Sequence, residues 1–231
     1  MSFVELFSVS VLVVSVPTHG DNLMVGHWAL WEGGTKHGDI SVGSLVYDPV
    51  TEQGVLNDWD LTREAGQNRK PSAEDNIKAV PFLALDLLRK RDFRNLVPRR
   101  YRHDAEAFTW CLIYICICIG KDDNGRITLN NPHHSSLWFT NLRASYWFRV
   151  GLDTGEPFQQ LPLHRRNLVT TLYQYWMDRF SDQSRAERSG KPYVEPSDDV
   201  LFKQLVENVI GLLPPYAEDV KERVRSRYRV G

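Results

Sequence analysis

The chain has 231 residues, of which 42% are apolar and 25% are charged, a balance that is ordinary for a globular protein. Its 28 Lys and Arg residues against 29 Asp and Glu residues leave a net charge of −1, which gives no electrostatic basis for binding nucleic acid. The three cysteines, Cys111, Cys116 and Cys118, fall in one apolar run. Their odd number and buried setting are typical of reduced core residues, so we expect an intracellular protein, cytoplasmic or nuclear.

The N-terminal segment, residues 1–20, contains an apolar stretch at residues 7–16. The stretch has the length of a signal-peptide core, but it lacks a basic start, follows Glu5 and has no A-x-A-like cleavage site. It is also too short to span a bilayer, so we expect neither secretion nor a membrane anchor. Its β-branched content favours a buried strand, and the remnant of an incomplete gene model is the alternative.

A helix is predicted to begin at Asp21 or Asn22, either of which can cap it, and to end at about Glu32, before two glycines. The residues that recur at helical spacing within it are Leu23, Met24, His27, Leu30 and Trp31.

The next stretch, residues 36–61, carries two aspartates, Asp39 and Asp58. Apolar runs at residues 45–47 and 54–56 flank a turn with Pro49 and Gly54, which predicts a small hairpin over residues 45–57. Such a hairpin would bring both aspartates to the same end of the ribbon. Two converging carboxylates suit phosphoryl transfer, in which one takes a proton from the attacking hydroxyl and the other holds Mg²⁺ against phosphates.

The middle of the chain alternates between a polar segment and a very apolar one. Residues 62–78 have no apolar period and predict a solvated loop. Residues 104–119 are apolar on nearly every face, which predicts a buried core helix, although their isoleucine content leaves a buried strand as the competing interpretation. Asp104 and Glu106 favour the helix, because negative charge suits a helix N-terminus.

The remaining elements are predicted to be helices joined by polar segments, so the fold class expected for the whole chain is mainly α. A turn at residues 121–125 is followed by one or two helices at residues 135–148. Helices are then predicted over residues 167–180 and 198–213, with a polar loop over residues 181–197 between them. The last 16 residues, 216–231, predict a charged helical tail.

Four motifs occur in an order that is typical of one fold. They are HGDIS at residues 37–41, DWDL at 58–61, VPFLALDLL at 80–88 and YRHD at 101–104. Together they resemble the catalytic loop, the metal motif, the end of the activation segment and the start of the central helix of the protein-kinase fold. The chain is most similar to the fungal-type protein kinase family, in which ALDLL stands where most kinases read APE.

The resemblance implies a protein-kinase-like C-terminal lobe over residues 21–215, with a small β-hairpin. It also implies ATP and Mg²⁺ as cofactors and a protein Ser/Thr hydroxyl as the acceptor. In it, Asp39 is the catalytic base, and Asp58 with Ser44 binds the metal and nucleotide. Thr62 or Ser72 in the activation segment could accept a regulatory phosphate.

The same resemblance implies structural roles for three further residues. His37 belongs to the catalytic loop, Asp86 closes the activation segment, and Asp104 ties down the catalytic-loop backbone.

The chain departs from the kinase pattern at several positions, and these departures predict impaired or absent activity. Ser44 stands where a metal-binding Asn is usual, Ser41 where many kinases have Lys, and Gly38 where an Arg is usual. Only 36 residues precede His37, with no Gly-rich loop and no Lys or Arg before Lys36, so we expect the N-terminal lobe to be absent or truncated. The loss of two charge-stabilising groups at about 3 kcal/mol each would slow transfer by about four decades.

Two other functions fit the same residues. A small-molecule phosphotransferase of the aminoglycoside or choline kinase type also uses HGD and DWD motifs. A non-catalytic pseudokinase scaffold, which binds a protein partner through the helical lobe, is the alternative from a different class. The sequence identifies neither the protein substrate nor the partner.

Overall fold

The computed structural model describes residues 23–48, 53–57, 80–89, 100–121, 124, 127–129, 149, 156–212, 222 and 225–226. These residues are mainly helical, as the sequence predicts. The helices are α3 (Leu23–Glu32), α5 (Leu85–Arg89), α6 (Tyr101–Cys118), α9 (Glu156–Gln159), α10 (Leu163–Arg188) and α11 (Asp198–Ile210), with single 3₁₀ turns η1 (Val42–Ser44) and η2 (Val80–Phe82). The strands are β1 (Leu45–Asp48), β2 (Gln53–Leu56), β3 (Ile119–Lys121) and β4 (Ile127–Leu129).

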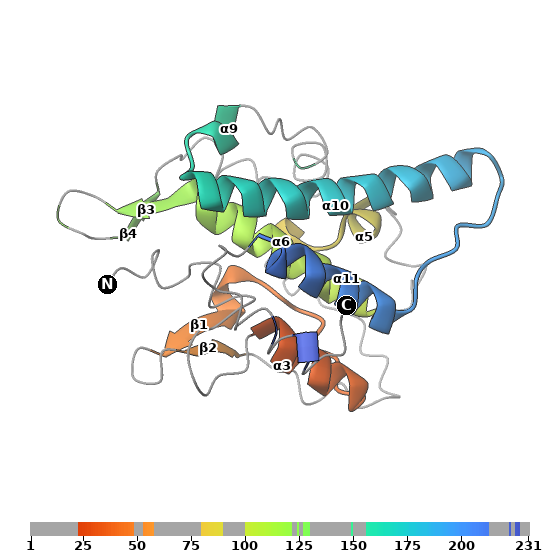
Figure 1. The fold of residues 1–231 in the computed structure, drawn as a ribbon, viewed down its shortest axis with the longest axis horizontal. Coiled ribbons are helices and arrows are strands. Elements are labelled where there is room, and N and C mark those ends of the chain that lie inside the picture. The colour runs from red at the N-terminus through yellow and green to blue at the C-terminus, as the bar shows by residue number, and fades with distance from the viewer. Residues whose placement is uncertain are drawn as a thin grey trace.

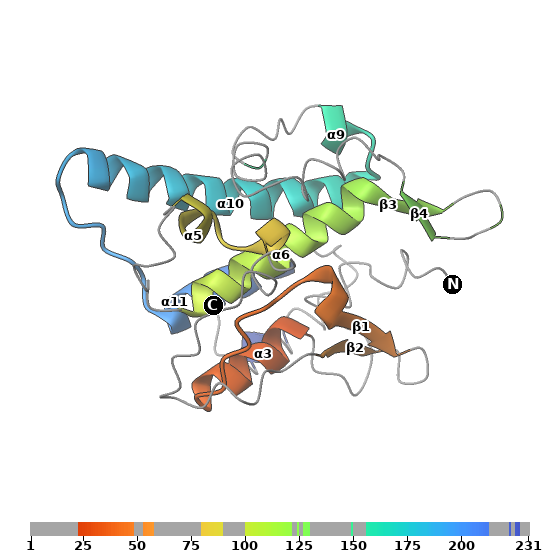
Figure 2. The same ribbon diagram turned by 180° about the vertical axis from the view of Figure 1, so that it is seen from behind.

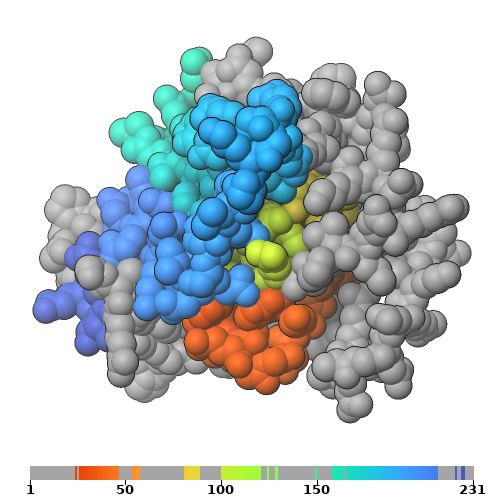
Figure 3. All heavy atoms as spheres, turned by 90° about the vertical axis from the view of Figure 1, so that its right-hand side faces the viewer, coloured from red at the N-terminus to blue at the C-terminus, as the bar shows by residue number. Residues whose placement is uncertain are grey.

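Helix α6 lies at the centre of the fold, with α3, α10 and α11 packed against it (Figures 1 and 2). All of its 18 residues except Arg102 and Cys116 are buried, as expected for a helix that is apolar all round. In Figure 3 only a small patch of it shows between the red-orange N-terminal residues and the blue C-terminal ones. The predicted core helix is therefore confirmed over the strand alternative, although it begins at Tyr101 rather than at Asp104.

Helix α3 follows the predicted range, but it presents a different face to the core. Met24, His27 and Trp28 are buried, whereas Leu30, which was predicted to face inwards, is 43% exposed. Trp28 stacks on Phe202 of α11, with ring centroids 4.9 Å apart and planes 7° from parallel. This contact joins the N-terminal part of the chain to its last described long helix.

The predicted hairpin over residues 45–57 is confirmed. Strands β1 and β2 pair antiparallel, with Leu45 opposite Leu56 and Val46 opposite Val55. The leucines are buried and the valines are exposed, because successive side chains of a strand point to opposite faces.

A second antiparallel hairpin, β3–β4, was not predicted. Lys121, which was expected to open a turn, is the last residue of β3, so the predicted turn at residues 121–125 is wrong at its start. Helix α6 ends at Cys118, and the extended backbone of Ile119 leads directly into the strand. Short runs with Ile on either side of polar, Gly-containing residues are typical of a hairpin, and this signal was missed.

Helix α10 is 26 residues long and continues to Arg188, so the predicted loop over residues 181–197 is wrong for its first eight residues. Side-chain pairs one turn apart support this extension, as in the contact of 3.3 Å between Gln183 Nε2 and Glu187 Oε1. The helix ends where Gly190 adopts a φ of 65°. In Figure 1 this end of α10 projects beyond α6 before the chain returns to α11.

Helix α11 begins at the predicted residue and is capped by Ser197, whose Oγ accepts a hydrogen bond from Val200 N at 3.4 Å. It ends at Ile210, three residues before the predicted end. The predictions for residues 1–20, 62–78 and 135–148 lie outside the described residues. No helix in the described part of the chain is both long and apolar enough to cross a membrane.

Candidate functional site

His37 anchors the loop that follows α3 to the end of the first hairpin. Its imidazole is buried, with Nε2 2.8 Å from the carbonyl oxygen of Asn57 and Nδ1 3.2 Å from the backbone nitrogen of Asp39. A backbone N–H can only donate, so Nδ1 accepts and Nε2 carries the proton given to Asn57. Burial lowers the pKa of His37, which favours this neutral form.

Gly38 holds the same loop to the central helix. Its backbone N–H donates to Asp104 Oδ2 at 3.2 Å, and Asp104 is fully buried in the first turn of α6. The φ of Gly38 is 78°, a conformation that favours glycine. A glycine, which stands here where kinases usually have an Arg, therefore suits the backbone of this loop. The bond itself is the contact that the kinase resemblance implied for Asp104.

Asp39 therefore directly follows two residues, His37 and Gly38, that hydrogen bonds hold in place. Its side chain is half-buried, and its backbone N–H is held by His37. Since the backbone on its N-terminal side is fixed both to α6 and to the residue after β2, Asp39 lies in a preorganised loop. Such a group can orient a hydroxyl and accept its proton without first having to be ordered.

Ser44, which was predicted to be a metal ligand, uses its hydroxyl within the local turn. The side chain is 1% exposed, and its Oγ both accepts from Ser41 N and donates to Ser41 O, each at 2.9 Å. The hydroxyl therefore closes the 3₁₀ turn η1, with its proton and one of its two lone pairs used within that turn. The backbone carbonyl of Ser44 is also in use, since it accepts from Asn57 N at 2.8 Å.

Asp58, the other predicted metal and nucleotide ligand, lies outside the described residues. Within the described part of the chain there is no group of three or more His, Cys, Asp or Glu residues that could hold a metal ion. The described residues thus include the Asp39 carboxylate and the contacts that hold its loop, but no cluster of such metal ligands. Thr62 and Ser72 also lie outside them.

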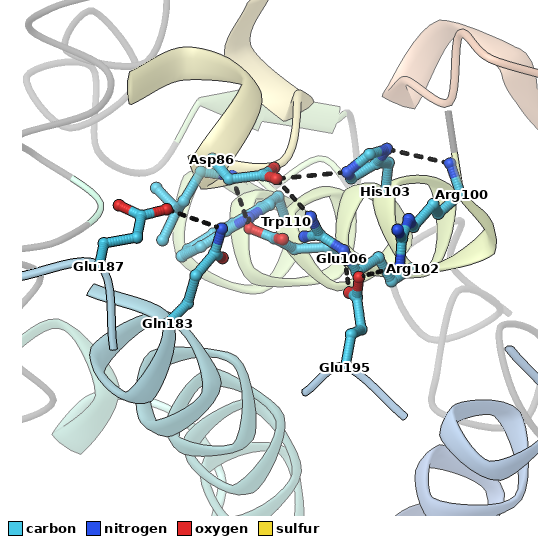
Figure 4. A network of polar contacts seen from close by, with 10 residues as sticks. Asp86, Arg100, Arg102, His103, Glu106, Trp110, Gln183, Glu187 and Glu195 are labelled. Carbon is cyan, nitrogen blue, oxygen red and sulfur yellow. Dashed lines mark hydrogen bonds and ion pairs between the residues drawn. The ribbon is translucent and has the colours of Figure 1, made fainter. Parts of the chain in front are cut away.

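Asp86 of α5 lies at the centre of a charge network that also includes residues from the start of α6 and from the segment before α11 (Figure 4). It pairs with Arg102 and with His103 Nε2, the latter at 3.4 Å. Glu195, from the segment before α11, pairs in turn with Arg102 and Arg100. Burial by itself would raise the pKa of Asp86, but the hydrogen bonds and charges of His103 and Arg102 hold it well below its usual range.

Two further buried charges fix residues 83–85, just before Asp86. Glu106 Oε1 accepts from Leu85 N at 2.7 Å and from Trp110 Nε1 at 3.0 Å, and burial raises the pKa of this carboxyl. Arg149 Nη2 donates to Leu83 O at 2.6 Å, and its guanidinium carbon lies 4.6 Å from the centre of a Trp110 ring. Burial lowers the pKa of Arg149 to about 9, against the opposing effect of Glu106.

These contacts are compatible with the structural role predicted for Asp86. The sequence did not indicate the residues that surround it, Glu106 and Glu195 among them. Glu106 was interpreted only as a helix-start signal, although a carboxylate on an otherwise apolar helix requires buried partners. Glu195 gave no signal, because it is separated from Arg100 by 95 positions. A small pocket lies beside this network, lined by Arg102, Trp176 and Glu195 among others, rather than beside Asp39.

The comparisons with known proteins agree with the family that the motifs indicated. Residues 21–116 match the family model of fungal protein kinase, a stretch that runs from α3 into α6. The family prediction is confirmed for this part of the chain. Neither a curated protein nor a solved structure matches the chain.

Proposed function

We propose, from the match of residues 21–116 to fungal protein kinase, that residues 21–215 form the C-terminal lobe of a protein-kinase-like domain. Its reaction would be phosphoryl transfer from ATP to a Ser or Thr hydroxyl of a protein. The matched family is one of protein kinases, which supports a protein acceptor over the small acceptors of the aminoglycoside or choline kinase type.

The observation that carries the proposal is the double anchoring of the loop before Asp39. His37 fixes the loop to Asn57, and Gly38 fixes it to Asp104. In the proposed reaction the Asp39 carboxylate accepts the proton of the acceptor hydroxyl as its oxygen forms a bond to the γ-phosphorus of ATP, and the bond from that phosphorus to the bridging oxygen breaks to release ADP. When bound, ATP with Mg²⁺ would supply the phosphoryl group and neutralise its charge, with Asp58 as the proposed metal ligand.

Ser44 supports the second part of the proposal, which is that this transfer is slow. Its hydroxyl is hydrogen-bonded to both the backbone nitrogen and the carbonyl oxygen of Ser41. A metal contact stabilises the developing charge by several kcal/mol, and the loss of about 3 kcal/mol slows transfer by about two decades. The same observation favours the second candidate function, a pseudokinase scaffold that binds a protein partner.

The test is phosphate transfer from radiolabelled ATP to a generic protein substrate, with Mg²⁺ and the full chain. We expect negligible transfer, and we expect Asp39→Asn to remove any genuine signal while the far-ultraviolet circular dichroism stays unchanged. A rate within about tenfold of the roughly 1–100 s⁻¹ of ordinary kinases, lost in Asp39→Asn, would refute the impairment. A signal that survives in Asp39→Asn would refute the role of Asp39.

A further inference from the structure

His27 of α3 makes a contact that neither the motifs nor the family match assigns. Its Nε2 lies 3.1 Å from Asp104 Oδ2, which is the same oxygen that accepts the backbone N–H of Gly38. One carboxylate oxygen thus joins α3, the catalytic loop and α6. Both His27 and Asp104 are almost completely buried, so this oxygen is removed from bulk water.

The imidazole of His27 is held in place by aromatic rings. It stacks on Tyr101, with centroids 5.5 Å apart, and meets the edge of Phe108 at 5.4 Å. Trp31 lies on the same helix with its ring centroid 6.2 Å away. Because these rings restrict the imidazole, its position relative to Asp104 is set by the packing of α3 on α6 and does not require the catalytic loop.

Because Asp104 is buried, the hydrogen bond from His27 Nε2 matters for the stability of its carboxylate. A carboxylate removed from water is strongly unfavourable unless hydrogen bonds compensate its charge. His27 is the side-chain donor from the core, whereas Gly38 is a backbone donor from a loop. The side-chain donor therefore orients the carboxylate towards the loop, and the loop binds to a group that is already fixed.

We propose that His27 is a positioning residue for the catalytic loop, acting through Asp104 on Gly38 and so on the placement of Asp39. Its bearing on phosphoryl transfer rests on the proposed function, but its effect on the loop does not. His27 itself does not touch the reacting atoms in this assignment.

The experiment compares His27→Gln with His27→Asn in the full chain. The terminal amide nitrogen of Gln can replace Nε2 of the imidazole, whereas that of Asn, one methylene shorter, falls near Nδ1 and cannot reach Asp104. The readout is the hydrogen-exchange rate of the Gly38 amide, measured by NMR without nucleotide. The Leu85 amide is the internal reference, because it also donates to a buried carboxylate, that of Glu106, with no histidine involved.

We expect the Gly38 amide to exchange about tenfold faster in His27→Asn, the change that follows loss of a hydrogen bond to a charged group. The Leu85 amide should be unchanged, and His27→Gln should keep the Gly38 rate near that of the wild type. If His27→Asn does not fold, His27→Phe, which keeps a ring beside Tyr101 and removes the donor, replaces it.

Two results would overturn the assignment. One is a Gly38 amide that exchanges at the wild-type rate in His27→Asn or His27→Phe. The other is an equal acceleration of the Gly38 and Leu85 amides, which would mean that His27 stabilises the fold in general. A wild-type chain that fails to bind ATP would refute the proposed function and would leave the exchange result for His27 unaffected.

Discussion

Removal of the Asp104 carboxylate should destabilise the fold more than most single substitutions. In Asp104→Ala, the Gly38 N–H and the His27 Nε2 both lose their acceptor at a site without access to water. Each buried donor left unsatisfied costs about 1–3 kcal/mol, so the free energy of unfolding should fall by about 2–6 kcal/mol. Since domains of this kind are stable by only about 5–15 kcal/mol, the change is a large fraction of the total.

The assay is urea unfolding followed by the fluorescence of the seven tryptophans. Asp104→Asn should cost less than Asp104→Ala, because the amide oxygen has two lone pairs and can still accept both hydrogen bonds, although without the negative charge. Asp199→Ala is the matched control, since Asp199 is an exposed aspartate of α11 paired with Lys203 at 3.0 Å. We expect that control to stay within about 0.5 kcal/mol of the wild type.

The reasoning would be refuted by an Asp104→Ala protein that unfolds within about 1 kcal/mol of the wild type. That result would mean that the loop and α3 find other partners at no cost. An equal fall in the free energy of unfolding in Asp104→Ala and Asp199→Ala would also contradict the reasoning, because the burial of the aspartate would then have no effect on the cost of its removal.

Three further predictions concern residues that the structure places in unusual environments. Burial lowers the pKa of His37 from its usual 6.5, so on acidification the unfolded chain binds a proton at this imidazole before the folded chain does. The fold should therefore lose stability as the pH falls below about 6.5. In His37→Gln, the urea concentration at the unfolding midpoint should change less between about pH 7.5 and 5.5 than it does in the wild type. Asp86→Asn should cost about 3 kcal/mol by leaving Arg102 with one buried partner fewer. The free energy of unfolding should also depend less on pH below about pH 4 in this variant. In the wild type the folded state holds the pKa of Asp86 below its ordinary value of 3.8, so the stability that Asp86 contributes is lost as the pH falls below that value. Gly190→Ala should lower the thermal midpoint, because a φ of 65° costs an alanine about 1 kcal/mol. The cost comes from the backbone alone, since no atom lies close enough to an added Cβ for a steric clash. An unchanged midpoint would show that α10 can end without a left-handed residue.

The parts of the fold that the sequence predicted correctly depend on local patterns. Helix α6 could be predicted because the stretch at residues 104–119 is apolar on nearly every face after its first turn, and such a helix must be buried. The β1–β2 hairpin followed from two apolar runs around Pro49 and Gly54. The second half of α10 could not be predicted in this way, because residues 181–188 are polar and are stabilised by pairs of side chains along one exposed helix.

The candidate site was predictable in its residue types but not in its orientations. The motif placed Asp39 and Asp104 in the site, and the resemblance implied their connection through the loop backbone. The inward rotation of the Ser44 hydroxyl towards Ser41 depends on the local turn and has no signature in composition or spacing. The contact of His27 with Asp104 joins residues 77 positions apart, so only the packed structure reveals it.

The position of a bound metal relative to Asp39 and Asp58 tests the kinase-like assignment most directly. Crystals of the full chain grown with ADP and Mn²⁺ would show the metal by its anomalous scattering. We predict one Mn²⁺ bound by the Asp58 carboxylate in a cleft shared with Asp39, while Ser44 Oγ keeps its two bonds to Ser41. Carboxylates of Asp39 and Asp58 on opposite faces of the lobe, with no metal between them, would contradict the assignment.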